Sequence, residues 1–229
     1  PLTSSRSVSF MPYSGATSII PFSDVPVAAL TTYPTLILIF GACGSTFVIP
    51  PVVLSKYKNI YLLQNDFIVF EEDKIIFYGT TLWTDGCSKE IDNYIENNVS
   101  DYKYIYKNNK LITRKEIISI YQYNKNRLLD FLEDIKTETT YTIFIISHHL
   151  PLRELVHNKY KNNILVSAYA CNLKDELTKY NFDYWIAGHT HETANYELNL
   201  DNNKIAKFLC NPRGYNNSNK VFDEYKYIE

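Results

Sequence analysis

Two strongly apolar runs in the C-terminal half constrain the fold of this chain more than any other feature. Residues 141–147 and 183–187 are short and rich in β-branched and aromatic side chains, which favours buried strands. A capping-box sequence at Thr113 opens a long helical pattern before the first run, and a shorter pattern at 174–180 precedes the second. Strands that alternate with helices in this way predict an α/β fold with a mixed sheet.

Shorter strands are predicted on either side of these runs. They cover residues 59–63, 67–70 and 74–78, and a hairpin at 194–200 and 204–210. The polar region 85–101 and the tyrosine-rich run 102–106 are interpreted as solvated loops, with a cap over a pocket as the alternative role.

The composition changes sharply near residue 55. Residues 1–55 contain one basic residue, Arg6, one acidic residue, Asp24, no lysine or asparagine, and seven of the nine prolines. All lysines and asparagines lie in 56–229. Two interpretations stay open: a Ser/Thr/Pro-rich leader, or a segment from another source joined by a frameshift, misassembly or fusion near residue 50. We therefore divide the chain into an atypical low-charge segment, 1–55, and one domain, 56–229.

Several properties limit the partners and the compartment. Residues 25–54 are uncharged, but prolines and glycines interrupt them, so we expect a buried strand at 35–40 and no membrane span. The net charge of −2 gives no signal for nucleic-acid binding. The four cysteines are scattered without a C-x-x-C pair, which favours a reducing, cytoplasmic location.

Three of the five histidines lie where predicted strands end. His148 follows the run 141–147, and His189 and His191 follow the run 183–187 within the sequence Gly-His-x-His. Open α/β sheets place their chemistry at the carboxyl ends of strands, and imidazole is a common ligand of zinc, manganese and iron. These residues are therefore candidate metal ligands, with histidines on a surface loop as the alternative.

Four motifs, taken together, resemble those of the calcineurin-like metallophosphoesterases. They are residues 79–85 (GTTLWTD), 145–151 (IISHHLP), 188–191 (GHTH) and 211–215 (NPRGY). The resemblance covers roughly the C-terminal two-thirds of the chain. It implies a two-sheet α/β sandwich flanked by helices, incomplete at its N-terminal side. It also implies two divalent metal ions (Mn, Fe or Zn) and hydrolysis of a phosphoric monoester or diester of unknown class.

The resemblance also implies individual roles. His148 and His189 would bind one metal ion and His191 the other, while His149 and Arg213 would contact the phosphorylated substrate. The guanidinium fork of Arg213 matches phosphate oxygens, although stabilisation of its own loop is an equally good interpretation.

The carboxylate half of such a site is missing from the sequence. The chain contains neither Asp-x-His nor Gly-Asn-His, and Gly41-Ala42 stands where the family has Gly-Asp. Two closely spaced divalent ions need anionic oxygens between them, which neutral imidazoles do not supply. Two hypotheses follow: an enzyme whose binuclear site is incomplete in this chain, or a non-catalytic binding or scaffold protein with the same fold.

Overall fold

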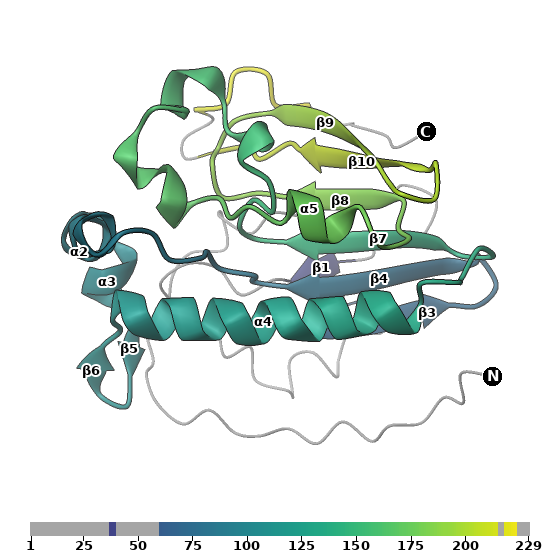
Figure 1. The fold of residues 1–229 in the computed structure, drawn as a ribbon, viewed down its shortest axis with the longest axis horizontal. Coiled ribbons are helices and arrows are strands. Elements are labelled where there is room, and N and C mark those ends of the chain that lie inside the picture. Colours follow the sequence, from purple (N-terminus) through teal and green to yellow (C-terminus); the bar gives the residue numbers. More distant parts are fainter. Residues whose placement is uncertain (1–36, 40–59, 215–217, 224–229) are drawn as a thin grey trace.

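A six-stranded mixed sheet forms the centre of the protein (Figure 1). The computed structural model describes residues 37–39, 60–214 and 218–223. The sheet has the order β3-β4-β7-β8-β10-β9, and only its edge strands β3 and β9 run antiparallel to their neighbours. Its strands are β3 (Asp66–Phe70), β4 (Ile75–Thr80), β7 (Thr142–Ser147), β8 (Tyr184–Ala187), β9 (Ala194–Asn199) and β10 (Ile205–Cys210). The predicted mixed α/β class is therefore confirmed.

Two small sheets accompany the main one in the described part of the chain. β1 (Ile37–Ile39) pairs in parallel with β2 (Ile60–Leu62), and β5 (Tyr106–Lys107) pairs with β6 (Lys110–Leu111) as a hairpin. The strand predicted at 35–40 thus forms at β1. The rest of 1–55 lies outside the described residues, so the proposed division of the chain at residue 55 stays a prediction.

Four helices and three short 3-10 turns complete the described structure. They are α2 (Lys89–Asn98), α3 (Asp101–Tyr104), α4 (Arg114–Asp134), α5 (Lys174–Leu177), η2 (Arg153–Leu155), η3 (Asn158–Tyr160) and η4 (Ile164–Ala168). The prediction of a loop across 85–101 is wrong, because α2 occupies most of it. Ser88 caps this helix, and its apolar residues Ile91, Tyr94 and Ile95 recur at helical spacing, a signal that the interpretation as a loop overlooked.

Helix α4 covers one face of the main sheet and begins as the sequence predicts (Figure 1). The side chain of Thr113 accepts from the backbone N–H of Glu116, and the Glu116 carboxylate accepts from the backbone N–H of Thr113. This reciprocal pair satisfies two amide groups that the first helical turn leaves without partners. Leu128 and Leu132 are completely buried where the helix meets the sheet.

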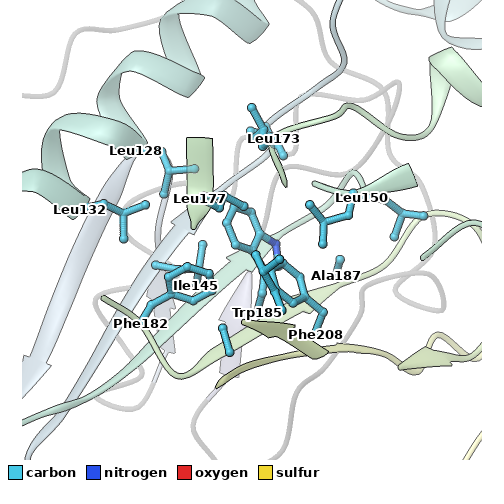
Figure 2. Close-up of a cluster of buried hydrophobic side chains, with 14 of the residues drawn as sticks. Leu128, Leu132, Ile145, Leu150, Leu173, Leu177, Phe182, Trp185, Ala187 and Phe208 are labelled. Atoms are coloured by element: carbon cyan, nitrogen blue, oxygen red, sulfur yellow. The ribbon is translucent and has the colours of Figure 1, made fainter. Parts of the chain in front are cut away.

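Side chains of alternating residues in the strands build a core on each face of the sheet, as strand geometry requires. On the α4 side, the rings of Trp185 and Phe208 stack with centroids 5.7 Å apart, beside Leu177 of α5 (Figure 2). On the opposite face, Phe77 and Phe144 stack at 4.9 Å in a cluster that includes Leu63, just after β2. Both faces of the sheet are therefore covered by apolar side chains.

No helix in the part of the chain that the structure describes has the length and apolar character needed to cross a membrane. The parallel strands β4, β7 and β8 all end at the same edge of the sheet. The candidate histidines lie in the loops after β7 and β8, and Arg213 follows β10, which runs parallel to β8.

Candidate functional site

Two neighbouring strand ends bring the predicted histidines to one place. Ser147 at the end of β7 lies opposite Ala187 at the end of β8, so His148 and Gly188 follow in adjacent positions. The Oγ of Ser147 accepts a hydrogen bond from Trp185 Nε1 at 2.8 Å and donates to the carbonyl of His149 at 2.7 Å. These bonds tie the turn after β7 to β8.

Four imidazoles gather beyond these strand ends, and we call them the imidazole cluster: His148, His149, His189 and His191. The ring of His189 lies 4.5 Å, centroid to centroid, from both His148 and His149, whose own rings are 5.0 Å apart. His191 is close enough for its charge to lower the pKa values of His148 and His189. The structure therefore brings the rings of His148, His149 and His189 together, and His191 follows two residues after His189 in the same loop.

Two aromatic side chains frame the cluster. The Trp83 ring lies 4.8 Å from that of His149, and the Tyr169 ring lies 4.9 Å from that of His189. Neither was singled out from the sequence. Trp83 belongs to one of the four quoted motifs, whereas Tyr169 carries no local signal and reaches the site only through the path of the chain after η4.

The backbone fixes the tautomer of His149. Its Nδ1 lies 3.1 Å from the carbonyl oxygen of Thr81, and because a carbonyl only accepts, Nδ1 carries the proton. The Nε2 atom then has a lone pair, is buried, and meets no hydrogen-bond partner among the described residues. Histidines that bind metals show this pattern, in which the second ring nitrogen donates to a backbone carbonyl.

Burial favours the neutral forms of three of these rings, those of His148, His149 and His189. It lowers the pKa of His148 to about 4, with the charge of His191 as the second cause. Burial also lowers the pKa of His149 and of His189 well below the ordinary value, and neighbouring imidazoles lower both further. Neutral rings keep their lone pairs, so the cluster is suited to donate to a cation or to accept hydrogen bonds.

Backbone strain is concentrated around the same residues. Leu82 and Trp83 have φ angles of 65° and 68°, and His189 and His191 have 67° and 55°. The left-handed region is unfavourable for side chains of this size, and such conformations cluster at functional sites. The loops after β4 and β8 therefore have backbone conformations that are unfavourable for their residues and that depend on tertiary contacts.

A buried arginine supports the strained loop after β4. Arg114 donates from Nε to Asp92 in α2 at 3.0 Å, from Nη1 to Thr84 at 2.9 Å, and from Nη2 to the carbonyl of Ser167 at 3.1 Å. It thereby joins the loop to α2 and to η4. The sequence gives no hint of this role, because an arginine in the first turn of a helix is normally exposed.

The segment after β10 packs against the far side of the cluster. Gly214 has a φ of 74°, and a Cβ added there would lie 3.3 Å from the Cβ of His191. Asn219 braces the segment by donating to the carbonyl of Pro212 at 2.6 Å and to Thr193 at 2.9 Å. Arg213 itself is exposed, and its expected contact with a substrate phosphate stays a prediction.

Comparisons of the chain with protein-family models, curated proteins and solved structures found no match. The resemblance to metallophosphoesterases therefore depends on the four motifs and on the site that they form.

The expected pair of divalent ions does not fit the residues that the structure describes. No group of three or more His, Cys, Asp or Glu side chains among them is placed to hold a metal ion. Burial raises the pKa of Asp85, the carboxylate of the motif 79–85, although the charges of Arg153 and Arg114 act in the opposite direction, and its Oδ1 is buried without a hydrogen-bond partner among the described residues. The clustered rings thus supply nitrogen donors without the anionic oxygens that a binuclear centre requires.

Proposed function

We propose that residues 56–229 are the greater part of a metal-dependent phosphoric ester hydrolase with a metallophosphoesterase-like two-sheet sandwich. In this chain the domain carries only the imidazole side of the catalytic centre. The observation that supports the proposal best is the meeting of His148, His149 and His189 at the carboxyl ends of adjacent parallel strands, with ring centroids 4.5–5.0 Å apart.

The chain as it stands should be inactive, for an electrostatic reason. Two divalent cations about 4 Å apart repel each other strongly unless carboxylates neutralise them. Imidazoles carry no negative charge, and the missing motifs would have supplied the carboxylates. We therefore expect no metal-stimulated hydrolysis of bis(4-nitrophenyl) phosphate or 4-nitrophenyl phosphate by the 229-residue chain.

The proposal is tested first in the coding DNA. Reading the codons of residues 1–55 and the DNA upstream in the other two frames should reveal Asp-x-His, Gly-Asp and Gly-Asn-His, in that order. A chain repaired to this reading should hydrolyse one of the two esters with Mn²⁺, and His189→Ala should abolish the activity. The exposed His157→Ala is the matched control and should leave the activity unchanged.

Three results would contradict this account. Absence of the three motifs from the other frames would refute an interrupted gene, and a folded but inactive repaired chain would refute the hydrolase. Turnover by the 229-residue chain that disappears in His189→Ala would show that the oxygen donors are not missing.

A non-catalytic binding or scaffold protein is the second candidate. The observation that favours it is that the described residues offer no set of ligands able to hold a metal ion. It predicts that the DNA contains no hidden motifs and that the purified protein carries no stoichiometric metal by elemental analysis. A stoichiometric metal ion that is lost in His189→Ala would exclude it.

A further inference from the structure

A second candidate site lies apart from the imidazole cluster, in a surface cavity between α2 and the segment that contains η2 and η4. The cavity has a volume of about 320 Å³, which is within the range of small-molecule sites. Its lining residues are Ile91, Arg153, Val156, Lys161, Asn163, Ile164, Val166 and Ser167.

The lining combines cationic groups with apolar side chains and contains no carboxylate. The guanidinium of Arg153 donates to the Oγ of Ser167 at 3.3 Å, which uses one of its five N–H groups. Lys161 forms no ion pair within 4.0 Å in the described structure. The nearby carboxylate of Glu154 is bound by Lys174 at 2.8 Å. The charge of Lys161 also acts on Glu154 and that of Arg153 acts on the partly buried Asp85, but among the described residues neither cation of the cavity forms an ion pair within 4.0 Å of a carboxylate.

We propose that this cavity binds a small organic phosphate. Arg153 provides a planar fork that matches phosphate oxygens, and Lys161 adds a second positive charge that suits a dianion better than a carboxylate. Ile91, Val156 and Val166 offer an apolar surface for the organic part of the ligand. An inorganic anion would leave that surface unused.

The wall of the cavity is continuous with the support of the imidazole cluster. Ser167 accepts from Arg114 through its carbonyl, and Tyr169, two residues later, contacts His189. The proposal nevertheless depends on the cavity alone and does not require the hydrolase function.

The test is a titration of the full 229-residue chain with phenyl phosphate, monitored by calorimetry and by NMR, in a buffer that contains EDTA to remove metal ions. Inorganic phosphate, benzoate and phenol serve as comparison ligands. We expect saturable binding of one phenyl phosphate per chain, tighter than that of any comparison ligand. We expect Lys161→Met to weaken the binding of phenyl phosphate roughly tenfold, because the variant loses a hydrogen bond between two charged groups. Lys179→Met, which removes an exposed lysine elsewhere, should have no effect.

The outcomes separate this site from the imidazole cluster. Unchanged binding in His189→Ala supports the cavity, whether or not the repaired chain is a hydrolase. Binding that disappears in His189→Ala, or that Lys161→Met leaves intact, would overturn the proposal. Absence of saturable binding, or equal affinity for benzoate, would also overturn it. Arg153→Met provides a second variant and should weaken binding at least as much as Lys161→Met.

Discussion

Acidification should destabilise the domain through the imidazole cluster. The pKa of His148 is lowered from 6.5 to about 4 by burial and by the charge of His191. A base with a lowered pKa in the folded state makes the unfolded chain the stronger proton acceptor. Its contribution to stability is therefore fully present above pH 6.5 and is lost as the pH falls towards 4.

The magnitude follows from the same shift. Between pH 7 and pH 5, the unfolded chain takes up nearly one proton at His148 that the folded chain does not, which costs about 2 kcal/mol. His149 and His189 shift in the same direction and add to the loss. Asp101 opposes it, because burial raises its pKa to about 6 and its protonation below that pH favours folding.

The contribution of Asp101 cancels when the parent chain is compared with a variant that lacks His148. Urea unfolding, followed by tryptophan fluorescence, gives the free energy of unfolding at pH 7, 6 and 5 for the parent chain and for His148→Gln. The parent should lose about 2 kcal/mol more than the variant over this range, since Asp101 contributes equally to both. His157→Gln, an exposed control, should behave like the parent. Equal losses in the parent and His148→Gln would refute the reasoning.

Three further predictions concern the supports of the site. Arg114→Met should lower the free energy of unfolding by about 3–5 kcal/mol in the same urea assay, because the partly buried carboxylate of Asp92 loses its partner. Lys115→Met, which changes an exposed residue, should alter it by less than about 0.5 kcal/mol. Gly214→Ala should shift the NMR signals of the His191 ring, because the new methyl group cannot be accommodated at this φ; unchanged signals would contradict the packing. Thr113→Ala should cost about 1 kcal/mol while Thr113→Ser retains the cap, and equal thermal stability of the two variants would show that the capping box contributes nothing.

The parts of the fold that are predictable from sequence are those with a strong local signal. Residues 143–146 and 184–187 are all apolar because both faces of the sheet are covered there, whereas buried or half-buried residues alternate with exposed ones in β9, which lies at the edge. Helix α2 does carry a local signal, the cap at Ser88 and the apolar residues Ile91, Tyr94 and Ile95, but the many polar residues between them favoured the interpretation as a loop. The order of strands in the sheet depends on packing between distant segments, which no local pattern encodes.

The residues of the candidate site also divide into those that the sequence predicts and those that it does not. His148 and His189 are visible in the sequence because each follows a recognisable strand, and strand ends of a parallel sheet meet at one edge. Tyr169 and Arg114 are not, since both reach the site across the tertiary structure from segments with ordinary sequences. The lone pair of His149 could be assigned only once the carbonyl of Thr81 was located beside its Nδ1.

The imidazole cluster is costly to keep for stability alone. Neighbouring rings are buried and neutral, and His189 and His191 have left-handed backbone conformations that cost on the order of 1–3 kcal/mol each. Apolar side chains of similar volume would fill the same space without the desolvation cost of the ring nitrogens. Arg114 and the strained loop after β4 support this arrangement, and we propose that the nitrogen lone pairs of the rings, and not their packing, are the reason for it.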